Sequence, residues 1–454
     1  MDAATTHAWK ALGGAADLAG HVTFVGAPGL ASPLPVRELA RATVGVCSLA
    51  AAELLAARTG RPLPEVRVDE GAVAVAFTSE RHLRVDGRPI PLFAPLSGFW
   101  RAQDGWVRTH ANYPHHRDRL LAALGIPDTG DETSLVDRLS AVVAELPAVE
   151  VQERAYAADG LAVAVAPPAP SDEPLVTSRP TGTGRSLPAR RPSRPADGIR
   201  VLDLTRVLAG PVATRSLALL GADVLRVDPP WLPEEVGTHL DTGFGKRSTR
   251  LALDDPADRS TFDELLDGAD VVVMGYRPGA LDRHGLGVAA LHERRPDLVV
   301  VELDAWAWEG TWAGRRGFDS LVQARCGIAD LLRAADGRPG ALPAQALDHG
   351  TGYLVAAAVL RGLTDRAATG AGRHVRASLT GTAAWLLSAA TSDVPTPAGS
   401  EDPDRWLVET DSPYGRLRYA RSPLGVAGLG TQWDHPPSVW GTDEARWAST
   451  SPPG

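Results

Sequence analysis

Asp348 is the residue whose type and position most favour covalent chemistry in this chain. It lies in the segment ALDHGTGYL, directly before an apolar stretch typical of a buried helix. A carboxylate is a nucleophile that can attack an acyl carbon and divide one difficult transfer into two easier steps. The N–H groups at the start of a helix stabilise a nearby anion. Asp is also a favoured helix N-cap, so the residue type alone leaves a structural role open.

The elements that must position Asp348 begin near residue 198. Residues 199–204 form an apolar run that predicts a buried strand, and a Gly-Pro turn at 210–211 follows. Residues 212–220 predict a helix that ends at Gly221, and residues 222–227 predict a second strand. Strand, helix and strand form a βαβ unit, whose crossover makes the strands parallel. The expected fold class is therefore α/β with a doubly wound, nucleotide-binding-type parallel sheet.

The residue identities in this region are more specific than its strand-helix-strand pattern. Seven blocks in order, spread over roughly 190 residues, resemble the family III CoA-transferases of the CaiB/BaiF group. They include VLDLTRVLAGP, GADVLRVD, GKRS, ADVVVMGYRPGALDRHGLG and ALDHGTGYLVAAAVLRGL. The resemblance implies the fold of that family, in which a smaller α+β domain accompanies the parallel sheet.

Changes in composition divide the chain. Residues 168–197 contain seven prolines and predict an exposed, partly extended linker. We interpret residues 1–167 as a degenerate first copy that includes the small-domain elements, and residues 198–390 as the nucleotide-binding half with Asp348. Residues 391–454 are interpreted as return strands and a C-terminal tail. Ala-rich helices expected at 37–57 and 351–363 are each followed by a glycine turn and a β-rich run, which suggests an internal repeat.

The resemblance assigns the catalytic role to Asp348. It implies a CoA-transferase that moves CoA from an acyl-CoA donor to a carboxylic acid acceptor through an aspartyl-CoA thioester. Coenzyme A is then a substrate, and neither a tightly bound cofactor nor a metal is expected. In the first copy, Glu38 falls nearest to the corresponding position. We expect Glu38 to be an ordinary solvated residue on a helix, so we predict one active site per chain.

Seven residues are expected to bind CoA. They lie in the first βα turn and in the basic or aromatic blocks that follow it: Val207, Leu208, Ala209, Lys246, Arg247, Tyr276 and Arg283. A helix N-terminus and side-chain cations both suit phosphate oxygens. The chain departs from the family pattern at three places, with Leu208 where Gln is frequent, Gly275 where Asn is common, and Pro229 or Pro230 where Arg often stands. These departures predict an altered CoA affinity or pose.

Two other functions stay open at this level. A 2-methylacyl-CoA racemase shares the fold but needs a His directly before the Asp of its G-x-D block, and this chain has Phe318 there. Because phenylalanine cannot exchange a proton, the sequence favours the transferase. The second alternative is a non-catalytic CoA-binding member of the family, which the degenerate halves and altered CoA contacts favour.

Composition indicates which partners and which cellular location to expect. The 454 residues carry a formal net charge of −9, without a basic run or basic-aromatic stripe, so no nucleic acid partner is expected. The two cysteines lack metal-type spacing, and neither a signal segment nor an unbroken membrane-length apolar run is visible. A cytoplasmic protein without a membrane partner is expected. Its assembly is expected to be an intramolecular pseudo-dimer or a homodimer.

Overall fold

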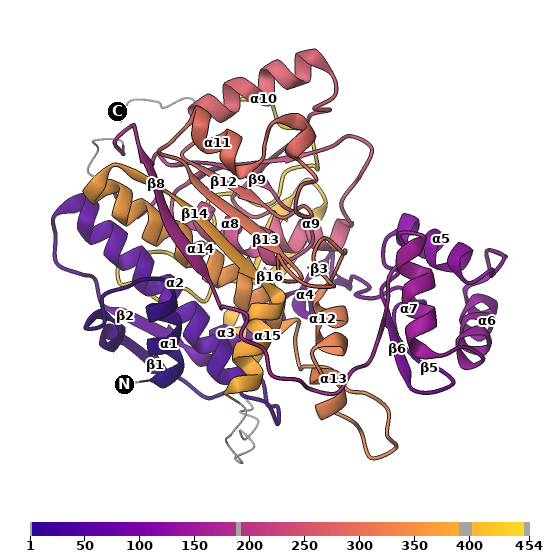
Figure 1. Cartoon of the computed structure of the whole chain (residues 1–454). Coiled ribbons are helices and arrows are strands. Elements are labelled where there is room, and N and C mark those ends of the chain that lie inside the picture. The colour runs from indigo at the N-terminus through magenta and orange to yellow at the C-terminus, as the bar shows by residue number, and fades with distance from the viewer. Residues whose placement is uncertain (1, 188–191, 390–401, 449–454) are drawn as a thin grey trace.

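A seven-stranded, mostly parallel sheet forms the centre of the computed structural model, which describes residues 2–187, 192–389 and 402–448 (Figure 1). The strand order is β11-β10-β9-β12-β13-β14-β8. Its strands are β8 (Thr177–Thr183), β9 (Arg200–Leu204), β10 (Asp223–Asp228), β11 (Arg247–Arg250), β12 (Val271–Met274), β13 (Val299–Asp304) and β14 (Ala371–Ser378). All neighbouring strands are parallel except β8, which pairs antiparallel with β14. The α/β class expected from the sequence is confirmed.

Helices cover both faces of this sheet (Figure 1). The helices after β9 are α8 (Ala209–Leu219), α9 (Val236–Thr242), α10 (Pro256–Gly268), α11 (Val288–Arg294), α12 (Asp319–Arg325), α13 (Ile328–Leu331), α14 (Ala346–Thr369) and α15 (Leu379–Ser388), and among them α8, α10, α14 and α15 contact the strands of the sheet. The central strands are buried on both faces, as β-branched runs such as Val271–Met274 indicate. The expected order β9, α8, β10 is present, with α8 starting three residues earlier than the sequence predicted.

The N-terminal segment packs onto the same body. It contains α1 (Ala3–Ala11), β1 (Val22–Val25), α2 (Val36–Thr59), β2 (Val66–Asp69), α3 (Glu70–Ala76) and α4 (Ser79–His82). Helix α2 lies along α14, and residues from 8 to 77 share one hydrophobic core with residues from 161 to 386. Both α2 and α14 span 24 residues and end at a left-handed glycine, Gly60 or Gly370, where residues with a Cβ are disfavoured. The internal repeat stays an interpretation.

Helix α2 is long and apolar enough to cross a membrane, judged by length and composition alone. In this fold, 78% of its apolar window is buried inside the protein. Its apolar surface is therefore used in the core, chiefly against α14.

The N-terminal half and the C-terminal region of the chain meet in a four-stranded sheet of order β15-β16-β3-β4. The N-terminal half supplies β3 (Arg84–Val85) and β4 (Arg88–Pro89), and the C-terminal region supplies β15 (Leu407–Ser412) and β16 (Gly415–Ala420). Short 3₁₀ turns lie at Leu18–His21, Asp282–His284 and Pro403–Trp406. Strands β15 and β16 lie within residues 391–454, the region interpreted from the sequence as return strands and tail, and β16 pairs with β3 from the other half of the chain.

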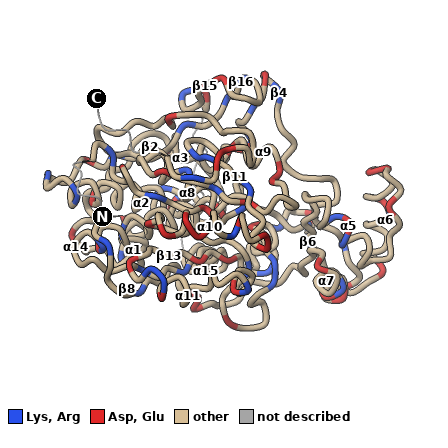
Figure 2. The backbone as a smooth tube through the Cα atoms, turned by 90° about the horizontal axis from the view of Figure 1, so that it is seen from above, with Lys and Arg blue, Asp and Glu red and all other residues tan. Residues whose placement is uncertain are grey.

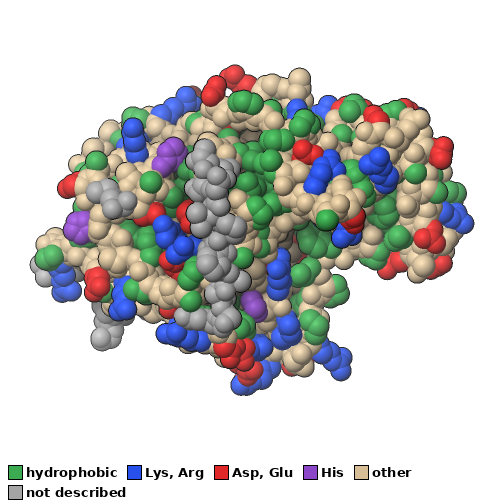
Figure 3. Space-filling view, turned by 90° about the horizontal axis from the view of Figure 1, so that it is seen from below, with side chains coloured by type: hydrophobic (Ala, Val, Ile, Leu, Met, Phe, Trp, Pro, Cys, Tyr) green, Lys and Arg blue, Asp and Glu red, His purple; other side chains and the backbone are tan. Residues whose placement is uncertain are grey.

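A smaller module projects from the body (Figure 1). It contains β5 (Phe99–Arg101), β6 (Trp106–Thr109), α5 (Pro114–Ala123), α6 (Glu132–Ala144), α7 (Ala148–Ala157) and β7 (Ala162–Ala164). A separate hydrophobic core with members between Leu96 and Ala162 holds it together. Hydrophobic side chains lie along the boundary between this module and the body (Figure 3). Acidic and basic positions are interspersed over both parts (Figure 2).

Part of the segment 168–197, which composition predicts as a linker, is a β-strand. Its exposed middle forms β8, which hydrogen-bonds to β14 as the edge strand of the central sheet. Composition could not reveal this pairing, because an exposed edge strand needs no apolar face and tolerates proline. Residues 188–191 of the segment, and residues 391–401 and 449–454 of the C-terminal region, lie outside the described residues.

Candidate active site

Asp348 lies in the first turn of α14, three residues after the N-cap residue Gln345. The helix starts at Ala346, earlier than its apolar pattern predicted, so Asp348 is inside the helix and is not its cap. Its side chain is buried with 5% exposure. The crossing of α14 over α8 is close, since a Cβ at Gly352 would lie 2.6 Å from the carbonyl oxygen of Ala209. This contact fixes Asp348 relative to the first βα turn.

A second carboxylate caps the helix that carries Asp348. Asp319, at the start of α12, accepts hydrogen bonds from the backbone N–H groups of Leu347 (2.9 Å) and Asp348 (3.0 Å) through Oδ2. Its other oxygen accepts a hydrogen bond from the side chain of Gln323. Asp319 therefore uses the helix N–H groups that the sequence suggested would stabilise the Asp348 anion. No hydrogen bond joins the Asp348 carboxyl group to another described residue.

Burial and neighbouring charge act together on Asp348. Burial, followed by the nearby Asp319 and Glu80, raises the pKa of the Asp348 carboxyl well above its usual range. Burial also raises the pKa of Asp319 to about 6. Carboxyls that share a low-dielectric site resist simultaneous ionisation. Ionisation of Asp348 is therefore disfavoured, and its anion is a poorly solvated, reactive nucleophile.

The N-terminal half contributes Glu80 to the surroundings of Asp348. Glu80 Oε2 lies 3.6 Å from Nε2 of His349, and neither atom has a hydrogen-bond partner. His349 is fully buried and stacks on Phe77, with 5.2 Å between ring centroids. Burial opposes ionisation of Glu80, but the neighbouring His349 outweighs it and holds the pKa of Glu80 below its usual range. Glu80 is thus an anion beside the catalytic candidate.

A cavity of about 400 Å³ opens between the body and the smaller module, and we call it the interlobe cavity. Its lining joins the first βα turn (Val207 and Leu208), the α14 N-cap Gln345, and Glu80 and His110 from the N-terminal half. Clefts at the carboxyl ends of parallel strands are the usual ligand sites of such sheets. The interlobe cavity therefore connects the first βα turn with the start of α14.

The first βα turn is held in a strained shape. Val207 has a φ of 67°, in the left-handed region that β-branched residues rarely adopt. Its backbone N–H donates a 3.1 Å hydrogen bond to Glu234, a buried carboxylate that also accepts from the hydroxyl group of Tyr113 at 2.5 Å. Tyr113 belongs to the smaller module, so both halves of the chain fix this turn. Leu208 is the N-cap of α8, and Ala209 is its first residue.

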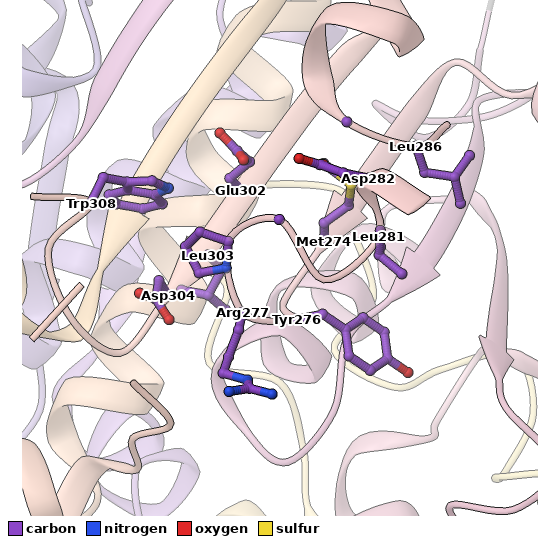
Figure 4. A pocket seen from close by; sticks show the side chains of 13 residues that line it. Met274, Tyr276, Arg277, Leu281, Asp282, Leu286, Glu302, Leu303, Asp304 and Trp308 are labelled. Carbon is purple, nitrogen blue, oxygen red and sulfur yellow. The ribbon is translucent and has the colours of Figure 1, made fainter. Parts of the chain in front are cut away.

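A loop at residues 277–279 borders two further cavities. The smaller, of about 30 Å³, is lined by Tyr276, Arg277 and Asp304 at the ends of β12 and β13. Arg277 and Asp304 project to the same side of the loop, and Tyr276 points away from them (Figure 4). Arg277 also lines a cavity of about 330 Å³ together with Arg315 and Arg316. Arg315 is paired with Glu153 at 3.0 Å and Arg316 with Asp159 at 2.9 Å, and both carboxylates line the same cavity, so Arg277 is the cation of this group most suited to a phosphate.

The basic residues expected to contact CoA do not lie together. The ammonium group of Lys246 is buried and contacts Asp203 Oδ2 and Thr214 Oγ1, each at 3.0 Å. Arg247 pairs with Asp223 at 2.7 Å, and the exposed Arg283 lies 3.5 Å from Asp254. None of the three lines the cavities described above. For Lys246 the structure provides a buried ion pair in place of the expected phosphate contact.

Sequence reasoning missed several residues that line these cavities. Arg277 stands in the same block as Tyr276, so the R-P-G turn was a signal for it. Arg315 and Arg316 directly precede the Gly317–Asp319 block and could have been found in the same way. Glu80 and His110 carried no signal, because only the fold brings them beside α14.

Comparison with known proteins agrees with this geometry. A sequence model described as CoA-transferase family III matches residues 196–408, a range that includes Asp348, Asp319 and the loop at 277–279. Residues 196–408 are therefore a CoA-transferase family III region. Its N-terminal segment, with Glu80 and His110, lies outside the matched range.

Individual relatives match over part of their length. An acetyl-coenzyme A transferase of Hypoxylon pulicicidum is 36% identical over 43% of this chain and 34% of its own length. A human succinyl-CoA:glutarate CoA-transferase is 32% identical over 46% of this chain and 51% of its own. A crystal structure of a hypothetical protein from Mycobacterium tuberculosis is 33% identical, covers 43% of this chain and 56% of its own, and has a TM-score of 0.41. The chain spans between 34% and 59% of the length of such curated relatives.

Proposed function

We propose that this protein transfers CoA between an acyl-CoA donor and a carboxylic acid through covalent intermediates on Asp348. The observation that carries the proposal is the position of Asp348, buried in the first turn of α14 three residues after Gln345, which lines the interlobe cavity, and within the family III region. Relatives named for CoA transfer support the general reaction class. The residues of the N-terminal half complete the cavity in which the reaction is proposed to occur.

The proposed reaction starts when an Asp348 oxygen attacks the thioester carbonyl carbon of the donor. The C–S bond breaks, CoA leaves as a thiolate, and a mixed anhydride remains on Asp348. The thiolate then attacks the aspartyl carbonyl, releases the donor carboxylate and forms an aspartyl-CoA thioester. The acceptor carboxylate attacks this thioester and the sequence runs in reverse, which regenerates Asp348. Burial keeps water from the intermediates and so preserves the thioester.

In this proposal CoA extends from the cationic side to Asp348. The nucleotide lies near Tyr276 and Arg277, and Arg315 and Arg316 would contact phosphate oxygens only by exchanging their ion pairs with Glu153 and Asp159. The backbone at Val207–Ala209 guides the pantetheine arm toward α14. Arg283, on the 3₁₀ turn Asp282–His284, and Arg247 stay predicted contacts. Lys246 is buried in an ion pair with Asp203 and has a structural role in this proposal.

Trapping with hydroxylamine tests the proposed function. Incubation with acyl-CoA and hydroxylamine should convert Asp348 into a hydroxamate, detected as a mass change on its peptide. Asp348→Ala should lose transfer by on the order of 10³-fold or more and yield no hydroxamate, while CoA binding persists. Near-native turnover of Asp348→Ala would contradict the mechanism. Absence of both adduct and transfer in the wild type would favour a non-catalytic CoA-binding role.

One observation favours the racemase as a second candidate. The ring of His110 stacks on Phe318 with 3.6 Å between centroids, beside the position where the racemase has its histidine. His110 lines the interlobe cavity, so it supplies an imidazole that Phe318 cannot. Deuterium uptake at the α-carbon of a 2-methylacyl-CoA in heavy water tests this activity. Uptake that depends on His110 and Asp348 supports it, and no uptake above the uncatalysed rate excludes it for that substrate.

We further propose that the chain acts as an intramolecular pseudo-dimer in the cytoplasm. The close packing of α2 on α14 supports the first part, because two similar helices from the two halves form one core. The two cysteines are free, which is compatible with a reducing compartment. The molar mass in solution, measured by light scattering, distinguishes a monomeric pseudo-dimer from a homodimer.

A further inference from the structure

The first βα turn has a backbone shape that its residues disfavour. Val207 has a left-handed φ of 67°, and Leu208, with φ −128° and ψ −57°, lies in neither the helical nor the extended region. Such conformations persist only where surrounding contacts hold them. Because Val207 and Leu208 both line the interlobe cavity, the contacts that hold this turn also shape the wall of the cavity.

Glu234 is the side chain that holds Val207. Its Oε2 atom accepts hydrogen bonds from the Val207 N–H at 3.1 Å and from the Arg226 guanidinium at 2.8 Å. The Glu234 side chain has no exposed surface. Burial opposes its ionisation, but Arg226 and Arg206, followed by the hydroxyl group of Tyr113, outweigh burial and lower the pKa of the carboxyl to about 2. Glu234 is therefore a buried anion across the neutral range, and the loss of any of its donors is costly.

One donor to Glu234 comes from the smaller module. The hydroxyl group of Tyr113, the N-cap residue of α5, donates a hydrogen bond to Glu234 Oε1. The other hydrogen-bond donors to Glu234 in the described part of the chain belong to residues 206–235 of the body. The Tyr113 hydroxyl group is thus the contact through which the module reaches this carboxylate and the turn that it holds.

The smaller module depends on boundary contacts for its position. Most of its buried apolar residues form a core separate from that of the body. Parts of a chain with separate cores move relative to each other unless their interface is large and apolar. A hydrogen bond between Tyr113 and a carboxylate that also binds Val207 therefore links the position of the module to the shape of the turn.

The N–H group of Val207 is occupied by this internal acceptor. Each backbone amide has a single N–H, and one that donates to a buried carboxylate is not available to a phosphate oxygen. The turn therefore contributes to ligand binding through the position of its other groups, and Glu234 sets that position.

We propose that Glu234 is a positioning residue for CoA binding, and that it makes the shape of the first βα turn depend on the smaller module through Tyr113. The proposal rests on the proposed function for the placement of CoA at Val207–Ala209. With the module in place, the Tyr113 hydroxyl and the Val207 N–H share one carboxylate, and the turn is preformed for the ligand. Without the hydroxyl, Glu234 keeps its cationic partners and holds Val207 less firmly, so part of the binding free energy is used to order the turn.

Binding of CoA to the full-length Tyr113→Phe variant tests the proposal. Phenylalanine keeps the ring beneath the Arg206 guanidinium, which lies 5.7 Å from the ring centroid, and removes only the hydroxyl group. The Kd for CoA, measured by calorimetry, should rise about tenfold, because a hydrogen bond to a charged group is lost. Hydrogen–deuterium exchange of the peptide that covers residues 205–212 should become faster in the absence of CoA. An unchanged Kd would overturn the proposal, even if the Tm falls, because the hydroxyl would then only stabilise the fold.

Tyr414→Phe is the matched control. The Tyr414 hydroxyl accepts a 2.9 Å hydrogen bond from the backbone N–H of Trp440, and Tyr414 is not among the described residues that line the interlobe cavity. This variant also loses one hydroxyl group from a folded region, and its Kd for CoA should equal that of the wild type. An equal rise of the Kd in both variants would refute a specific role for Tyr113.

A double-mutant cycle shows whether Tyr113 acts through Glu234. Glu234→Gln replaces the anion by an amide of the same shape, and it should raise the Kd for CoA at least as much as Tyr113→Phe does. The double variant should bind CoA about as Glu234→Gln alone does, because the hydroxyl has no effect once its acceptor is changed. Two effects that multiply in the double variant would show that Tyr113 acts on CoA independently, and would refute the proposal.

Two readouts keep the outcome interpretable. Circular dichroism shows whether Glu234→Gln is folded, and if it is not, the Kd of Tyr113→Phe against that of Tyr414→Phe still decides the proposal. Failure of hydroxamate trapping in the wild type would refute the proposed catalysis but leave these CoA affinities interpretable. An unchanged Kd in Tyr113→Phe would refute the positioning role and leave the trapping result intact.

Discussion

The carboxylate of Asp319 accepts a hydrogen bond of 3.0 Å from the backbone N–H of Asp348. This contact makes Asp319 a positioning residue, because it orients the first turn of α14 without facing the interlobe cavity. It also places a second ionisable carboxyl next to the proposed nucleophile, and each raises the cost of ionising the other. The pair therefore couples the geometry of the site to its pH dependence.

Asp319→Asn should shift the acidic limb of the rate profile. Loss of the neighbouring anion lowers the pKa of Asp348, so the nucleophilic carboxylate forms at lower pH than in the wild type. The measurement is kcat/KM against pH for one acyl-CoA and acid pair. A purely structural role would lower the rate without moving the limb, so an unmoved limb would contradict the coupling.

Asp348→Asn should stabilise the fold as the pH rises. A carboxyl whose pKa is raised in the folded state contributes stability below its unfolded-state pKa and loses it as pH rises through the folded-state pKa. Asparagine cannot ionise and so avoids this loss. The Tm difference between variant and wild type should widen as the pH rises above the ordinary Asp pKa of about 4, reaching roughly a few degrees. A constant difference across this range would argue against a raised pKa.

Lys246→Met should destabilise the protein and only indirectly affect CoA. It leaves Asp203 as an unpaired buried carboxylate, and removing one partner of a buried pair costs about 3–5 kcal/mol. Urea unfolding followed by circular dichroism measures this loss. The double variant Lys246→Met with Asp203→Leu should recover much of it. A stable single variant with weakened CoA binding would instead restore the phosphate role predicted from the sequence.

Arg277→Ala should weaken CoA binding by about tenfold, because it removes a cation from the proposed phosphate site. The remaining affinity should depend less on salt than that of the wild type. Calorimetry at two ionic strengths provides both values. Arg247→Ala and Arg283→Ala, measured in parallel, test the contacts expected from the family resemblance. If Arg277→Ala binds CoA as the wild type does while Arg283→Ala binds CoA more weakly, the phosphates lie near Arg283.

Residues 198–454 expressed alone should be poorly soluble or inactive. Without residues 1–167, the face of α14 that contacts α2 is exposed, and β16 loses its partner β3. Co-expression with residues 1–167 should restore solubility and transfer activity. A soluble, monomeric and fully active fragment would show that the N-terminal half is accessory.

The sequence determined the features that depend on neighbours along the chain. The run at 199–204 and the glycines at 60 and 370 each specify a local shape, and the structure has β9 and the two helix ends there. The resemblance to the family pointed to Asp348 and Tyr276 as candidate site residues without information about their contacts. Tertiary structure decided which charges face a ligand. Lys246 turned inward because Asp203 and Thr214 lie beneath it, and Glu80 reached His349 across 269 positions of sequence. Electrostatic interactions act through space, and no periodicity along a chain encodes such distant partners.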